Sequence, residues 1–152
     1  MKTLSKLFST LFYVGFIPYA PGTIASAFTV VFWYIFINIF TTYVFFIFIL
    51  LLTALSFYLV NIYTNDQSSS DPSEVVIDEF IGQSIPLMFL SRNSEIFEIL
   101  FVFICFRIFD IYKIYPVNLG EKINGSVGVI ADDIIAGIYT VIFLMIYKII
   151  IY

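Results

Sequence analysis

The sequence contains no histidine, a single cysteine and few charged residues. The absence of histidine excludes a histidine nucleophile, a histidine general base and a histidine-ligated zinc site. The cysteine, Cys105, lies in an apolar run and leaves no disulfide framework or thiolate metal cluster. Neither a basic patch nor a strip of basic and aromatic residues is present, so the sequence predicts no nucleic-acid partner.

Charge is scarce along the whole chain. Charged residues make up 12% of the 152 residues, whereas hydrophobic residues make up 61% and aromatic residues 20%. Soluble domains have about 25% charged residues. So few charges cannot cover a water-facing surface, and we expect lipid to surround much of a single domain over residues 1–152.

Long apolar runs predict an all-α fold, a polytopic bundle of transmembrane helices. A helix needs about 20 apolar residues to cross the hydrocarbon layer. Residues 7–17 are too few and end at Pro18, which predicts an interfacial or re-entrant segment. A cleavable signal peptide is the alternative, but apolar sequence continues past its small-residue site at 25–27. The predicted spans are residues 23–40, 43–63, 76–90, 96–112 and 127–147, of which 76–90 is short.

Positive charge predicts the orientation of these spans. A cytoplasmic N-terminus follows the positive-inside rule, with Lys2, Lys6, Lys113 and Lys122 inside and Arg92 and Lys148 outside. The same topology brings the unusual polar residues to the cytoplasmic face. They are Pro21–Gly22–Thr23, Asp78–Glu79, Arg107 with Asp110, and Asp132–Asp133.

The convergence of acidic side chains at one membrane face predicts a bound divalent cation. An ionisable residue costs about 2.5–3.5 kcal/mol at the centre of a span, and clustered acids also repel one another. Arg107 and Lys113 are too few to neutralise the acids, and carboxylates without histidine or thiolate favour Mg²⁺ or Mn²⁺. Such a site suits phosphoryl chemistry. The candidate catalytic residues are Asp78, Glu79, Asp110, Lys113, Asp132 and Asp133, and the acids among them other than Asp110 are candidate metal ligands.

Other residues predict how a phosphate would be held. Residues three apart share a helix face, so Arg107, Asp110 and Lys113 form a stripe on which Lys113 and Arg107 would bind a phosphate oxygen. Asp110 would touch the metal or orient Lys113. Gly22 and Thr23 open a helix, which is a natural anion site. Both acid pairs are expected near helix starts, where the helix dipole stabilises anions.

Each element also has a purely structural interpretation. The acid pairs would then point to water, Arg107 and Asp110 would form a structural ion pair, and Pro21–Gly22–Thr23 would be a turn and cap. Glu95 and Glu98 are expected on a solvated face.

Two other functions stay open for the residue pattern itself. A cation or proton transporter would place its acids near mid-membrane, with access from both sides. A small structural subunit would explain the helices but not the acids.

Asp71 is expected in a loop or as a helix cap.

Four sequence blocks occur in an order and spacing that resemble the phosphatidylglycerophosphatase A family over nearly the whole chain. They are GFIPYAPGTIAS at 15–26, DPSEVVIDEFIG at 71–82, FRIFDIYKIYP at 106–116 and GSVGVIADDIIAG at 125–137. The resemblance implies a Mg²⁺-dependent phosphatase of the bacterial inner membrane. It would act at the cytoplasmic face on phosphatidylglycerophosphate and release phosphatidylglycerol and phosphate.

The family's motifs map onto residues of this chain. The acidic motif falls on Asp78 and Glu79, the FDxxK motif on Asp110 and Lys113, and the DDxxAG motif on Asp132 and Asp133. Departures from residues common in the family occur at Tyr19, Ala25, Ile114 and Ser126, and they leave every carboxylate in place.

Metal-activated water is the phosphatase chemistry that fits these residues. Cys105 precedes Arg107 by two positions in an apolar helix rather than on a phosphate-binding loop, and no DxD motif supplies an aspartyl nucleophile. In the resulting hypothesis, some of the four candidate ligands hold Mg²⁺, Lys113 and Arg107 bind the phosphomonoester, and one carboxylate accepts a proton from water.

Overall fold

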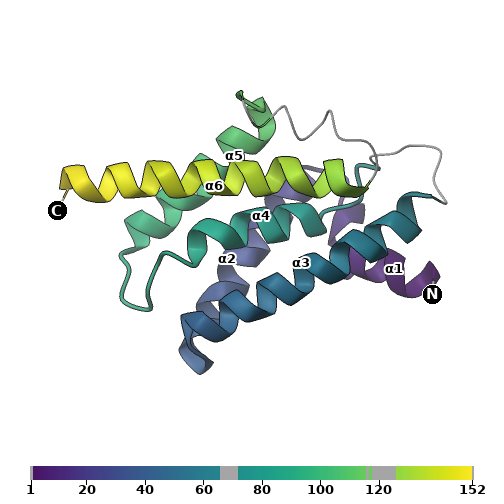
Figure 1. The fold of residues 1–152 in the computed structure, drawn as a ribbon, viewed down its shortest axis with the longest axis horizontal. Helices are drawn as coiled ribbons and strands as arrows, with labels where there is room; N and C mark the ends of the chain where they lie inside the picture. Colours follow the sequence, from purple (N-terminus) through teal and green to yellow (C-terminus); the bar gives the residue numbers. More distant parts are fainter. Residues whose placement is uncertain (1, 66–71, 116, 118–125, 152) are drawn as a thin grey trace.

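A computed structural model describes residues 2–65, 72–115, 117 and 126–151. Over these ranges the chain forms six α-helices and one 3-10 helix, with no strand, and the predicted all-α fold is confirmed (Figure 1). The elements are α1 (Lys2–Ser9), η1 (Val14–Phe16), α2 (Pro21–Ile39), α3 (Thr42–Thr64), α4 (Ile77–Leu87), α5 (Ile96–Tyr112) and α6 (Ser126–Ile151).

Three of the described helices are long and apolar enough to cross a membrane: α2, α3 and α6. The prediction of a further span at 76–90 is wrong in length, because α4 has 11 residues and ends one residue after Pro86. Eleven residues rise about 16 Å, roughly half of a hydrocarbon layer about 30 Å thick. The helix α5 has 17 residues, which is the lower limit for a crossing.

The turn after α4 nevertheless carries the chain to the opposite end of the bundle. Arg92 lies in this turn and donates hydrogen bonds from Nη2 to the backbone oxygens of Ile37, at 2.7 Å, and Asn38, at 2.9 Å. These carbonyl groups lie at the C-terminal end of α2 and have no helical partner there. The start of α2 and the start of α4 therefore lie at the same end, as the sequence predicts.

The short helix α4 lies inside the bundle, packed against α2 and α6 (Figure 1). Small residues allow this close packing. A side chain at Gly82 would come within 2.6 Å of the Asp133 backbone oxygen, and one at Gly137 within 2.5 Å of the Gly82 oxygen. Backbones that approach so closely are typical of helix packing in membranes.

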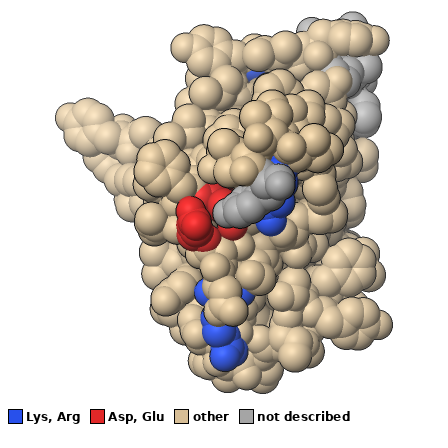
Figure 2. All heavy atoms as spheres, turned by 90° about the vertical axis from the view of Figure 1, so that its left-hand side faces the viewer, with Lys and Arg blue, Asp and Glu red and all other residues tan. Residues whose placement is uncertain are grey.

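Large apolar side chains cover the outside of the bundle. Val31 of α2, Leu51 of α3, Leu100 of α5 and Ile142 of α6 are all exposed. Figure 2 shows the end of the molecule opposite the start of α6, where charged side chains gather in small groups on a mostly uncharged surface. A surface this apolar is stable in lipid rather than in water.

The N-terminal segment differs from its prediction in where it is helical. The helix α1 begins at Lys2 and ends at Ser9, before most of the predicted segment 7–17, and it packs against α3. Its backbone is tied to the entrance of α4 by the hydrogen bond that Val76 N donates to Ser9 O at 3.0 Å. With eight residues it does not cross a bilayer, which agrees with an interfacial placement.

One acid expected on a solvated face is buried instead. Glu98 is 5% exposed, and its Oε1 lies 3.4 Å from Nζ of Lys148. The predicted last span ends at residue 147, but α6 continues to Ile151 and places Lys148 on a helix beside α5. A buried carboxylate is stable there because it has a basic partner.

Candidate active site

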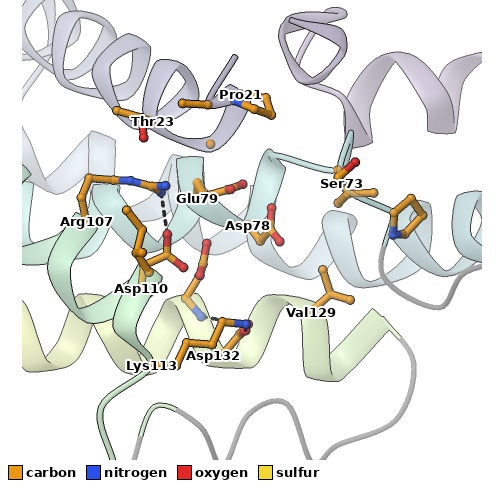
Figure 3. A pocket seen from close by; sticks show the side chains of 16 residues that line it. Pro21, Thr23, Ser73, Asp78, Glu79, Arg107, Asp110, Lys113, Val129 and Asp132 are labelled. Carbon is orange, nitrogen blue, oxygen red and sulfur yellow. Dashed lines mark hydrogen bonds and ion pairs between the residues drawn. The ribbon is translucent and has the colours of Figure 1, made fainter. Parts of the chain in front are cut away.

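The predicted site residues line one pocket of about 460 Å³ (Figure 3). It lies where α2, α4 and α6 begin and α5 ends. The predicted residues that line it are Gly22, Thr23, Asp78, Glu79, Arg107, Asp110, Lys113, Asp132 and Asp133. Two predicted residues, Asp71 and Lys122, lie outside the described part of the chain.

The first acid pair lies in the first turn of α4. Asp78 is 8% exposed and Glu79 is half-buried. Each of them offers a carboxylate oxygen within 4.8 Å of one from Asp133. The N-terminal end of a helix carries partial positive charge, which favours acidic side chains at this position.

The second acid pair lies in the first turns of its helix, as predicted, but beyond the first turn itself. Asp132 and Asp133 follow the start of α6 at Ser126 by about two turns. The helix dipole acts mainly within the first turn, so it does not account for these acids. Asp133 is only 3% exposed, and Gly82 makes room for the Asp133 backbone on α4. The close packing of α4 on α6 therefore brings the two acid pairs together.

Two basic side chains close the pocket from α5. Arg107 forms an ion pair with Asp110, three residues later, and donates from Nη1 to Ser26 Oγ at 3.3 Å. This ion pair agrees with the structural interpretation of the two residues. Lys113 ends α5 in a left-handed conformation, with φ of 44°, and its Nζ lies 2.8 Å from Oδ2 of Asp132.

The start of α2 forms the wall opposite the acids. Pro21 is the first helical residue, and Ala20 before it is left-handed with φ of 46°. The following Gly22 has no room for a side chain, because a Cβ atom would overlap Glu79 Oε1 and come within 3.2 Å of Arg107 Nη2. Gly22 therefore lets α2 approach both of these charged groups.

The pocket carries more negative than positive charge. Five carboxyl groups and two basic side chains line it. Within the described residues, Glu79 Oε2 and Asp133 Oδ2 are buried without a hydrogen-bond partner. Burial raises the pKa of the Glu79 carboxyl group, on the short helix α4, and the nearby Asp110 raises it further. A bound cation would supply the missing partner for these oxygens.

Two polar residues of the site escaped sequence reasoning. Ser26 accepts the hydrogen bond from Arg107, and Ser73 lines the pocket from the segment before α4. Ser26 lies one helical turn after Gly22, so its helix face was a usable signal. Ser73 lies in a polar connection, where spacing does not indicate which side chain turns inward.

Known proteins resemble the chain over most of its length. A sequence profile described as phosphatidylglycerophosphatase A matches residues 7–148. The chain belongs to the phosphatidylglycerophosphatase A family. Proteins called phosphatidylglycerophosphatase A from Escherichia coli and Haemophilus influenzae are 31% and 35% identical over 82% and 84% of this chain, which are 72% and 78% of their own lengths.

A third relative has a different description. A Bacteroides thetaiotaomicron protein is 33% identical over 91% of this chain and 90% of its own length, and it is provisionally described as a phosphatidylinositol-3-phosphatase. No solved structure matches the chain.

Membership of the phosphatidylglycerophosphatase A family confirms the predicted class of enzyme, a phosphoric monoester hydrolase. It also supports a place in phospholipid metabolism and, with the three apolar helices, association with a membrane. The transporter alternative is not favoured. The individual roles of the site residues stay predictions.

Proposed function

We propose that the chain is a Mg²⁺-dependent phosphatase that hydrolyses phosphatidylglycerophosphate at the cytoplasmic face of a bacterial inner membrane. The observation that carries this proposal is the juxtaposition of an acidic cluster with two basic side chains in one pocket. The family and two relatives described as phosphatidylglycerophosphatase A support the choice of substrate.

The donor set fits a hard divalent cation. Asp78, Glu79 and Asp133 provide carboxylate oxygens within 4.8 Å of one another, and two of these residues have a buried oxygen without a described partner. Mg²⁺ prefers oxygen ligands and commonly binds one or two carboxylates together with water and phosphate. Asp132 is already engaged by Lys113, so we assign the metal first to the other three acids.

Bound Mg²⁺ would withdraw charge from the phosphoryl oxygens and would make a water molecule more acidic. It would also offset the surplus of carboxylates, which otherwise repels an anionic phosphate. The chain's own groups then orient the substrate.

The two basic side chains would bind the phosphomonoester. Arg107 is fixed by Asp110 and Ser26, which leaves its planar guanidinium facing Glu79 across Gly22. Lys113 is partly exposed at the pocket and held by Asp132, so its ammonium group can shift from this carboxylate to a phosphate oxygen. The arrangement resembles other sites in which arginine and lysine stabilise the charge of a transferring phosphoryl group.

One carboxylate would accept the proton of the attacking water. Asp110 and Asp132 are the acids not assigned to the metal, and each is paired with a basic residue. Movement of Lys113 toward the phosphate would release Asp132, which makes Asp132 the better candidate for the general base. The proton would pass to this carboxylate as the water oxygen bonds to phosphorus and the bond from phosphorus to the glycerol oxygen breaks, and the carboxylate would then return the proton to the leaving glycerol oxygen.

The depth of the site suits a lipid headgroup. Between Asp132 and Lys148, α6 rises by about 24 Å, close to the thickness of a hydrocarbon layer. The acids and Lys148 would therefore lie near opposite interfaces. Lys2 and Lys6 of α1, which packs on α3, favour the cytoplasmic side for the end that holds the pocket.

A second substrate deserves a direct test because one relative is described differently. Phosphatidylinositol 3-phosphate is also a lipid phosphomonoester, and the same basic residues would bind its phosphate. Purified protein in detergent micelles should release phosphate faster from phosphatidylglycerophosphate, and a chelator should abolish this release until Mg²⁺ is restored. Faster release from the inositol lipid would show that phosphatidylglycerophosphate is not the preferred substrate. Full activity in the presence of chelator would refute the dependence on Mg²⁺.

A further inference from the structure

A second pocket, of about 280 Å³, has walls made only of apolar side chains. It is lined by residues of α1 and the turn after it, together with α2, α3 and α4, and six of its nine lining residues are phenylalanines. We call it the phenylalanine pocket. With no polar group in its walls, it suits a hydrocarbon chain rather than water or an ion.

The phenylalanine pocket adjoins the candidate active site through the first turn of α4. Ile77 and Phe80 line it. The two residues between them, Asp78 and Glu79, line the pocket of the candidate active site, which we call the acidic pocket. The Phe80 ring lies 6.4 Å from the Phe28 ring and 5.5 Å from the Phe32 ring, centroid to centroid. Under the proposed function, a molecule that reaches both pockets carries a phosphate at one end and an apolar segment close beside it.

A strained turn forms the remaining wall. Leu11, Phe12 and Tyr13 follow one another with φ of 47°, 54° and 70°. This left-handed conformation is unfavourable for residues that are not glycine. Such strain persists where surrounding contacts impose it, and it is common at ligand clamps.

Hydrogen bonds hold this turn in place. Phe12 N donates to Leu7 O at 2.8 Å, and Tyr13 N donates to Thr10 Oγ1 at 3.2 Å. As a result Leu11 is buried at 5% exposure, while Phe12 lines the pocket and is still 64% exposed. Phe12 thus lies at an open edge of the phenylalanine pocket, beside the interfacial helix α1.

We propose that the phenylalanine pocket binds one acyl chain of the lipid phosphomonoester while its phosphate occupies the acidic pocket. The proposal rests on the proposed function and adds the place on the protein where an acyl chain of its substrate binds. Bulk lipid would contact any exposed apolar face, such as that of Leu51 on α3. The phenylalanine pocket differs from such a face because it shares a helical turn with the acids and is walled by a strained turn.

Two neighbouring leucines of α3 allow a matched test. Leu52 lines the phenylalanine pocket, whereas Leu51 is 65% exposed and does not line it. Leu52→Trp fills the pocket, and Leu51→Trp adds the same ring to the lipid-facing surface. Both variants are assayed on long-chain phosphatidylglycerophosphate and on the same headgroup without acyl chains.

For Leu52→Trp we expect KM for the long-chain lipid to rise at least about tenfold, the lower limit of the effect of one methylene group in a hydrophobic pocket. Its kcat/KM for the deacylated headgroup should equal that of the unaltered protein, and Leu51→Trp should change neither. Equal behaviour of the two variants on the long-chain lipid would overturn the proposal. Failure of the unaltered protein on both substrates would instead refute the proposed function.

A second measurement covers a Leu52→Trp protein that does not fold. A non-hydrolysable phosphonate analogue with a diazirine on its acyl chain is photolysed with the unaltered protein. Labelling concentrated on Phe8, Phe12, Phe48 and Leu52 rather than on Leu51, and competed by unlabelled analogue, supports the proposal. Labelling spread evenly along the exposed face of α3, without competition, shows bulk lipid contact and overturns it.

Discussion

Gly22→Ala separates the chemistry of the acidic pocket from the stability of the fold. The new methyl group would overlap Glu79 Oε1, which is the end of a flexible side chain, and would contact Arg107 Nη2 at 3.2 Å. The carboxylate can move away, so the helices need not shift. Glu79 would then leave the position in which it approaches Asp78 and Asp133.

The expected effects on activity and stability differ in size. A displacement of about 1 Å at a reacting centre lowers activity by roughly 100-fold, which is our expectation for kcat/KM. Alanine is a better helix former than glycine by about 1 kcal/mol, which offsets the cost of moving the Glu79 side chain. We therefore expect the free energy of unfolding to change by less than about 1 kcal/mol. The assay is phosphate release in detergent micelles, with a thermal melt of the same sample.

Gly82→Ala is the matched control. Its methyl group meets the Asp133 backbone oxygen at 2.6 Å and the Phe106 ring at 2.7 Å, neither of which can rotate away easily. Overpacking of this kind costs about 1–3 kcal/mol of stability. Normal kcat/KM in Gly22→Ala would refute the placement of Glu79 in the reaction, and equal destabilisation of both variants would refute the packing argument.

Three further predictions concern single side chains. Lys113→Gly and Lys113→Ala should lose activity equally, but the glycine variant should be more stable by about 1 kcal/mol because φ at this position is 44°; equal melting temperatures would contradict this. Glu98→Gln should leave kcat unchanged and lower the melting temperature, because Lys148 loses its buried partner. A reduced kcat would show that the end of the bundle with Glu98 and Lys148 affects the candidate active site. Gln83→Leu should raise stability by about 1–2 kcal/mol, since both amide atoms are buried without a described partner, whereas a loss would indicate a buried water.

Much of the fold could be predicted, because it depends on continuous segments of the sequence. The helices α2, α3 and α6 follow from apolar runs long enough to span a bilayer. The short α4 was mistaken for a span because the apolar sequence continues beyond it, although Pro86 marks its end. The error did not affect the site, because the turn after α4 completes the passage to the opposite end.

The sequence predicts which residues belong to the site, but not which of them contact each other. Asp78, Asp110 and Asp132 line one pocket because consecutive helices start and end at alternate ends of the bundle, an arrangement that span counting predicts. The contact between Lys113 and Asp132 depends on the packing of α5 against α6 and on the left-handed end of α5. Neither the packing nor that end has a sequence signal.

The strained turn at Leu11–Tyr13 is the clearest feature beyond sequence reasoning. Its residues have no preference for the left-handed conformation, which glycine and asparagine adopt more readily. Contacts with α4 and within the turn impose it, and these form only in the folded chain.

The most direct test of this account is calorimetric titration of Mg²⁺ into the purified protein in detergent. The account predicts that the unaltered protein binds the cation and that Asp133→Asn weakens binding at least about tenfold. Glu98→Gln, which removes a buried acid at the other end of the bundle, should bind as tightly as the unaltered protein. Equal Mg²⁺ affinity in the unaltered protein and Asp133→Asn would contradict the claim that Asp78, Glu79 and Asp133 share a metal ion.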